Sequence, residues 1–114
     1  MFLRIWKFQV RAGKADEFRT VYGPQGTWAA LFRRVAGYLG TDLLQSTTDP
    51  NIYFTTDRWE SPEAWAAFLR AWGEDYVALD RRCESLTIAE TEVGEFRSHT
   101  SAAGPTSLIS DERR

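Results

Sequence analysis

The residues of this sequence that could do chemistry gather around one acidic side chain, Asp57. Side chains alternate between the two faces of a β-strand, so a strand that ends at Trp59 places Asp57 and Thr55 on one face, where Arg4 of the first expected strand can join them. Burial raises the pKa of a carboxylic acid and a nearby arginine lowers it. Asp57 is therefore a candidate proton acceptor. The alternative is a structural role, because buried acids are usually paired with an arginine or a backbone amide.

The side chains expected around this acid are mostly large and aromatic. Together with Arg4 and Thr55 they predict an apolar cavity with few polar groups, of the kind that orients a planar ligand. Large aromatic residues also dominate ordinary cores, so a filled core is the alternative interpretation. The aromatic residues of this predicted pocket are Trp6, Tyr22, Phe32, Tyr53, Trp59, Trp65 and Trp72.

Other kinds of site are not supported by the sequence. The single histidine, His99, and the single cysteine, Cys83, lie in separate segments, and no acidic cluster has the spacing of metal ligands. A Ser-His-Asp mechanism lacks its core histidine, and no glycine-rich loop opens a helix as a nucleotide site requires. We therefore expect neither a metal nor a cofactor.

Composition excludes several partners. A chain of 114 residues with 43% hydrophobic residues is long enough for one domain with a real core. The net charge of −2 gives no basic surface for nucleic acid or an anionic membrane, and no apolar stretch is long enough to span a bilayer. The N-terminal residues lack the pattern of a secretory signal peptide, and the single cysteine cannot form an internal disulfide. We therefore expect a cytoplasmic protein.

Hydrophobic periodicity and turn signals predict the elements that would position the pocket. The clearest boundary is the corner after Trp59, where Ser61 is a good N-cap, Pro62 suits the first helical position and Glu63 complements the helix dipole. The expected order is strand 2–10, helical pieces 14–22 and 27–35, strands 38–47 and 52–59, helix 62–82 and strand 84–96. Three glycines mark expected irregularities. Gly37 is expected to end a helix in the left-handed conformation, and Gly40 indicates a bulge or a close approach of another backbone. Gly73 predicts that the long helix kinks or restarts near Glu74.

This order predicts an α+β fold of the ferredoxin-like β-α-β-β-α-β type, a four-stranded antiparallel sheet with both helices on one face. Residues 1–96 would form the domain, and residues 97–114, which lack periodicity, a loosely ordered tail. The helix-free face would expose an apolar patch that includes Leu3, Ile5, Ile52 and Phe54. We therefore expect a homodimer joined sheet to sheet.

Three features together resemble the antibiotic biosynthesis monooxygenase family of the dimeric α/β-barrel superfamily. They are the corner, the run Gly37-Tyr38-Leu39-Gly40-Thr41, and the first crossover interrupted by glycine and proline. The resemblance covers about residues 2–96, and its best local marker is Trp59-Glu60-Ser61-Pro62-Glu63-Ala64-Trp65. It implies that two sheets pair into a dimeric α/β barrel. Members include cofactor-independent oxygenases of polycyclic phenols or quinols, haem-degrading enzymes and proteins with no known reaction.

The oxygenase pattern of that family matches this sequence in part. Its corner tryptophan and following aromatic residue correspond to Trp59 and Trp65, whereas Thr55 and Leu79 stand where the pattern has asparagine and arginine. The imidazole of the haem-degrading pattern has no counterpart near Ala78. Three functions remain open. They are a cofactor-independent monooxygenase for a planar aromatic phenol or quinol, a non-catalytic ligand-binding or scaffolding homodimer, which Thr55 and Leu79 favour, and an isomerase or lyase in the same barrel.

Overall fold

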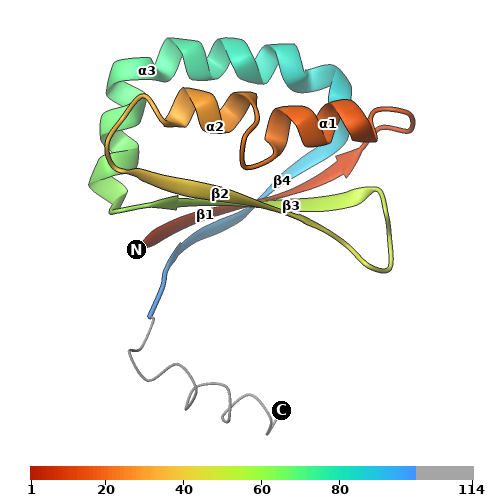
Figure 1. Cartoon of the computed structure of the whole chain (residues 1–114), viewed down its shortest axis with the longest axis horizontal. Coiled ribbons are helices and arrows are strands. Elements are labelled where there is room, and N and C mark those ends of the chain that lie inside the picture. Colours follow the sequence, from red (N-terminus) through yellow and green to blue (C-terminus); the bar gives the residue numbers. More distant parts are fainter. Residues whose placement is uncertain (100–114) are drawn as a thin grey trace, which may run out of the picture.

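The computed structural model describes residues 1–99, which form a layer of helices on one antiparallel sheet (Figure 1). Two short helices, α1 and α2, together make the first crossover, because Gly23-Pro24-Gln25-Gly26 separates them. The predicted ferredoxin-like β-α-β-β-α-β order is therefore confirmed. The elements are β1 (Phe2–Val10), α1 (Ala15–Tyr22), α2 (Thr27–Phe32), β2 (Tyr38–Gln45), β3 (Ile52–Trp59), α3 (Pro62–Cys83), the 3-10 turn η1 (Glu84–Leu86) and β4 (Thr87–Arg97).

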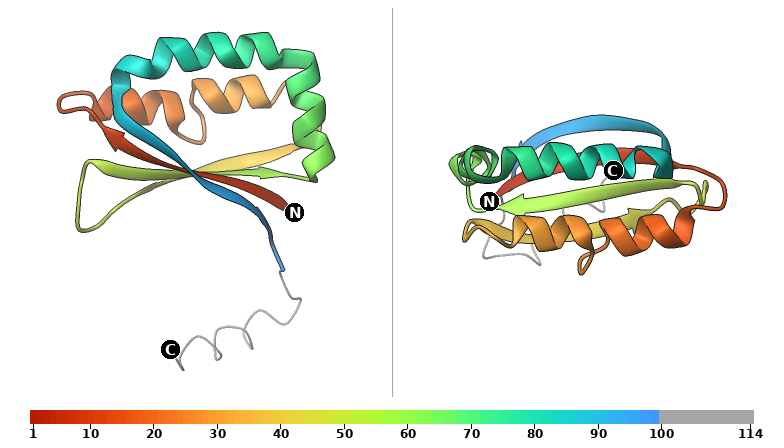
Figure 2. Two further views of the ribbon diagram at one scale, coloured as in Figure 1. Left: turned by 180° about the vertical axis from the view of Figure 1, so that it is seen from behind. Right: turned by 90° about the horizontal axis from the view of Figure 1, so that it is seen from above.

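The sheet has the strand order β2-β3-β1-β4, and neighbouring strands are antiparallel. Helices α1, α2 and α3 cover the same face, with α1 and α2 beside α3 when the molecule is seen from above (Figure 2). The central strands place Arg4 opposite Asp57 and Trp6 opposite Thr55. These side chains therefore all point toward the helices, as the alternation of the sequence predicts.

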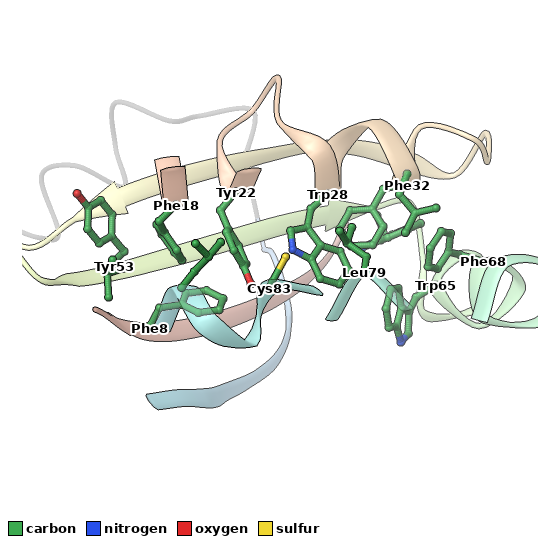
Figure 3. Close-up of a cluster of buried hydrophobic side chains, with 14 of the residues drawn as sticks. Phe8, Phe18, Tyr22, Trp28, Phe32, Tyr53, Trp65, Phe68, Leu79 and Cys83 are labelled. Atoms are coloured by element: carbon green, nitrogen blue, oxygen red, sulfur yellow. The ribbon is translucent and has the colours of Figure 1, made fainter. Parts of the chain in front are cut away.

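Aromatic side chains fill most of the space between the sheet and the helices (Figure 3). Trp59 is completely buried at the end of β3, and its ring centroid lies 5.2 to 5.6 Å from those of Phe32, Tyr38, Trp65 and Phe68. Such tilted and edge-on pairs stabilise a core beyond the area that they bury. The high aromatic content is thus used largely for packing.

The corner between β3 and α3 has the N-cap and the first helical residue that the sequence predicts. The Ser61 hydroxyl oxygen accepts a hydrogen bond of 3.1 Å from the Ala64 amide, and Pro62 is the first helical residue. The helix kinks at Trp72, which has φ −129° and ψ 20°, directly before Gly73. The predicted N-cap and kink are therefore confirmed.

The prediction that Gly37 ends the second helical piece in a left-handed conformation is wrong. Helix α2 ends at Phe32, and the glycines with positive φ within residues 1–99 are Gly13, Gly40 and Gly94. A side chain on Gly37 would instead collide with the Cβ of Ala64, so this glycine lets two backbones approach closely. The predicted bulge at Gly40 is confirmed by its φ of 143° and a shift of register in β2.

The last strand begins later than predicted, at Thr87 and not at Glu84. Leu86 ends the 3-10 turn before it, is buried in the core, and accepts a hydrogen bond of 2.9 Å from the amide of Arg11, directly after β1. The strand then continues to Arg97. Most of the predicted tail, residues 100–114, lies outside the described residues. None of the described helices is long and apolar enough to cross a membrane.

Candidate functional site

A cavity of about 50 Å³ lies between the sheet and the helices. Strands β1, β2 and β3 form its floor, helices α1, α2 and α3 form its roof, and β4 contributes to one side. Six of the twelve lining residues are aromatic, and three are acidic. The lining residues are Arg4, Trp6, Phe8, Tyr22, Trp28, Phe32, Thr41, Thr55, Asp57, Tyr76, Asp80 and Glu90.

Asp57 is the buried acid of this cavity, with 8% of its surface exposed. Its Oδ1 accepts a hydrogen bond of 2.7 Å from the Thr41 hydroxyl, and the Thr41 oxygen lies 2.5 Å from the hydroxyl of Tyr38. Thr41 has a single hydroxyl hydrogen, which it gives to Asp57, so Tyr38 must be the donor to Thr41. The result is a short chain of hydroxyl groups that ends on the carboxylate.

Burial raises the pKa of Asp57 to about 6, although the hydrogen bond from Thr41 and the charges of Arg4 and Arg58 act in the opposite direction. Desolvation is the larger effect because the charged form loses its hydration in the cavity. At neutral pH the carboxyl group is therefore mostly ionised, but it takes up a proton more readily than an ordinary aspartate. This is the property that a general base requires.

Arg4 does not form an ion pair with Asp57, which explains why the acid is not held at a low pKa. Its Nε donates to Glu95 on the neighbouring strand at 3.2 Å, and its guanidinium lies 3.9 Å above the ring of Trp65. The arginine is thus shared between an acid and an aromatic ring. Within residues 1–99, the direct partner of Asp57 is a hydroxyl group and not an arginine.

Six of the ten residues proposed from the sequence line this cavity: Arg4, Trp6, Tyr22, Phe32, Thr55 and Asp57. The other four lie elsewhere. Trp59 and Trp65 pack in the aromatic core, and Trp72 is half-buried at the kink of α3. Tyr53 is buried under α1, where its hydroxyl accepts a hydrogen bond of 2.7 Å from Arg19.

The sequence patterns did not place Phe8, Thr41, Trp28 and Tyr76 in the cavity. Thr41 faces Asp57 only because the bulge at Gly40 shifts β2 by one residue, and a one-residue shift moves every side chain to the other face. Trp28 and Tyr76 follow the helical stripes that predict a core, so no sequence signal distinguishes them from core residues. Asp80 and Glu90 at the side of the cavity are exposed, and only the packing of α3 near β4 brings them there.

The described residues contain no group of three or more potential metal ligands. Thr55 and Leu79, which replace the asparagine and arginine of the oxygenase pattern, are both buried. The cavity can therefore supply a carboxylate base, hydroxyl groups and aromatic walls, and its chemistry depends on what the ligand brings.

Comparisons with known proteins agree with this architecture. The sequence model of the family named antibiotic biosynthesis monooxygenase matches residues 1–73, which is more than half of the chain. No curated protein matches the sequence significantly.

Solved structures share the fold at low sequence identity. SnoaB, a cofactor-independent oxygenase from Streptomyces nogalater, is 22% identical with a TM-score of 0.70, over 90% of this chain and 96% of that one. PA3566 from Pseudomonas aeruginosa is 19% identical with a TM-score of 0.62, over 87% and 94%. A mutant of MhuD with two manganese protoporphyrins in each active site is 22% identical with a TM-score of 0.65, over 91% and 100%.

Proposed function

Because the chain belongs to the antibiotic biosynthesis monooxygenase family, we propose that it is a cofactor-independent monooxygenase for a planar aromatic phenol, quinol or anthrone. The observation that carries this proposal is Asp57, a buried carboxylate with a pKa raised to about 6 inside an aromatic cavity. The resemblance in fold to SnoaB, a cofactor-independent oxygenase, supports it by analogy.

The reaction needs a base and a dry site, because the substrate itself supplies the electrons. In the keto form of a polycyclic phenol, Asp57 takes a proton from an activated CH₂ group, R₂CH₂, and the carbanion combines with O₂ to give the peroxide anion R₂CH–OO⁻. Asp57 returns its proton to this anion, which gives the hydroperoxide R₂CH–OOH. Asp57 then removes the remaining C–H proton while the O–O bond breaks to give R₂C=O, and this proton passes to the leaving hydroxide to form water. One oxygen atom thus enters the product and the other leaves as water.

Oxygen consumption with a panel of anthrones and polycyclic quinols tests the proposal directly. We expect a protein-dependent rate that rises with pH through about 6 and that Asp57→Asn lowers at least about 100-fold, as for loss of a general base. Asp75→Asn is the matched control, because Asp75 pairs with Arg34 at 3.6 Å on the surface. An Asp57→Asn protein with unchanged turnover on an accepted substrate contradicts the role of Asp57.

A non-catalytic ligand-binding dimer is the second candidate, favoured by Thr55, Leu79 and the small size of the cavity. It predicts that members of the panel bind while no oxygen is consumed with any of them. Product formation from a bound ligand in the absence of O₂ would instead indicate an isomerase or lyase.

We also propose that two copies pair through the open face of the sheet. Leu3, Ile5, Ile52 and Phe54 lie on this face, as do two residues that the register adds. Leu44 pairs with Phe54 and is 54% exposed, and Phe96 pairs with Leu3 and is 42% exposed. An apolar patch of this kind is typical of an interface.

A further inference from the structure

The cavity contains a buried hydrogen-bond donor that the proposed chemistry does not use. Trp28 on α2 is 8% exposed and lines the cavity. Its indole nitrogen is one of two buried side-chain polar atoms for which residues 1–99 provide no hydrogen-bond partner. An indole N–H can only donate, and an unpaired donor in an apolar site is costly. An acceptor oxygen within hydrogen-bond distance of this nitrogen would therefore satisfy Trp28.

The surroundings of this nitrogen are rich in donors. Figure 3 shows the indole nitrogen of Trp28, the hydroxyl of Tyr22 and the sulfur of Cys83 pointing toward one another. Burial raises the pKa of both the Tyr22 hydroxyl and the Cys83 thiol, so both keep their protons at neutral pH. The nearby indole of Trp28 slightly lowers the pKa of both groups. Tyr22, which lines the cavity, and Cys83 beside it are therefore both uncharged at neutral pH, and each still carries its hydrogen.

The other unpaired indole nitrogen belongs to Trp59, and it differs in one respect. Trp59 is completely buried among aromatic rings and does not line the cavity. A ligand in the cavity can therefore reach the environment of Trp28 but not that of Trp59. The chain offers a buried tryptophan of each kind, which makes Trp59 an internal control.

We propose that Trp28, with Tyr22 beside it, forms a binding subsite for an acceptor oxygen of the ligand, a carbonyl or phenolic oxygen on an aromatic ring. The class of ligand rests on the proposed function. Trp28 comes from the helical roof of the cavity and Asp57 from its floor, with the rings of Phe8, Phe32 and Tyr76 also lining it. A substrate with two oxygen functions would direct one to Trp28 while its acidic hydrogen faces Asp57. The indole would thereby select the orientation of the substrate.

Paired probes on the full chain test this subsite. We would titrate protein labelled with ¹⁵N-tryptophan with 1-indanone and with indane, which share one bicyclic frame and differ by the carbonyl oxygen. We expect 1-indanone, but not indane, to shift the indole N–H resonance of Trp28 downfield while that of Trp59 stays in place. Trp28→Phe should reduce the preference for 1-indanone over indane about fivefold, the effect of one neutral hydrogen bond. Trp59→Phe should leave this preference unchanged.

The ratio of the two affinities still reports on the hydrogen bond if Trp28→Phe loosens the packing, because a change in the shape of the cavity weakens the binding of both probes alike. If 1-indanone binds without moving the Trp28 resonance, or if Trp28→Phe weakens both probes equally, the subsite is refuted and the indole nitrogen meets water only. If neither probe binds, the aromatic ligand class is refuted as well. Binding with the expected shift but no oxygen consumption by any quinol or anthrone would refute the proposed reaction and leave the subsite intact.

Discussion

At the level of single residues, the pKa of Asp57 depends on which neighbouring side chains contact its carboxylate. An aspartate beside two arginines would ordinarily have a low pKa, and Arg4 and Arg58 do lower the pKa of Asp57. Arg4 is held by Glu95 and Trp65, and the Arg58 side chain forms an ion pair with Asp42. Desolvation therefore outweighs the effect of the two arginines, and the pKa of Asp57 remains raised.

The raised pKa of Asp57 predicts a pH-dependent cost in stability. The folded protein holds this proton up to about pH 6, whereas an unfolded aspartate releases it near its ordinary value of 3.8. Stability therefore falls as the pH rises between these values and stays lower above them. The shift corresponds to about 3 kcal/mol of unfolding free energy. Asp57→Asn, which can still accept from Thr41, should be stabilised relative to the natural protein by about this amount more at pH 8 than at pH 3.5.

Urea unfolding of both proteins at one protein concentration, from pH 3.5 to pH 8, measures this difference. The other carboxyl groups contribute equally to the two proteins and cancel in the comparison. Asp75→Asn should show no such pH-dependent gain. A constant difference between the natural protein and Asp57→Asn across this range would show that Asp57 titrates normally.

At the scale of elements, the corner after β3 is locked to the loop before β2. Glu60 donates its backbone N–H to the carbonyl of Gly37 at 2.9 Å, and a Cβ on Gly37 would overlap that of Ala64 in the first turn of α3. The corner therefore requires glycine at position 37, which has no Cβ. This contact holds the first turn of α3 against the loop before β2.

Gly37→Ala should lower the unfolding free energy by about 1–3 kcal/mol, because the added methyl group overpacks this contact. Gly73→Ala is the matched control. A Cβ at Gly73 meets nothing within 4 Å, so this change should be neutral or stabilising by up to about 1 kcal/mol. Thermal or urea unfolding measures both.

A double variant tests the cause of the expected loss. Ala64→Gly removes the methyl group that Gly37→Ala would meet, so the two changes together should cost less than the sum of their separate effects. Strictly additive costs would mean that the overlap of Cβ atoms is not what Gly37 avoids.

At the scale of the whole molecule, the two faces of the sheet differ. The helices cover one face (Figure 2), where they and the sheet line the cavity, whereas Leu44, Phe54 and Phe96 remain on the other face. The edge strand β4 is exposed along most of its length. Exposed edges and apolar faces favour association, so the single chain leaves a surface that a second copy could cover.

Light scattering at micromolar concentration should give the mass of a dimer. Phe54→Lys should raise the dissociation constant at least about 100-fold, because an unpaired charge would be buried in the apolar contact. Val77→Lys is the control, since Val77 is 47% exposed on α3, away from the open face. A monomeric natural protein, or equal effects of the two changes, would contradict pairing through the sheet.

The residue pattern alone predicts the order of the elements and the faces of the central strands. These features depend on local rules. Alternation in β1 and β3 assigns Arg4, Thr55 and Asp57 to one face, and Ser61 with Pro62 starts α3 through contacts within one turn. The same rules indicated an apolar open face, because they show which side chains the helices leave uncovered.

Which aromatic residues line the cavity, and which group binds Asp57, follow from the packing of the folded chain. Trp28 and Trp59 look alike in sequence, yet one borders the cavity and the other fills the core. The partner of Asp57 depends on the bulge at Gly40, which rotates Thr41 toward it. Such contacts join residues far apart in the chain, and their geometry depends on register and packing, which no local pattern records.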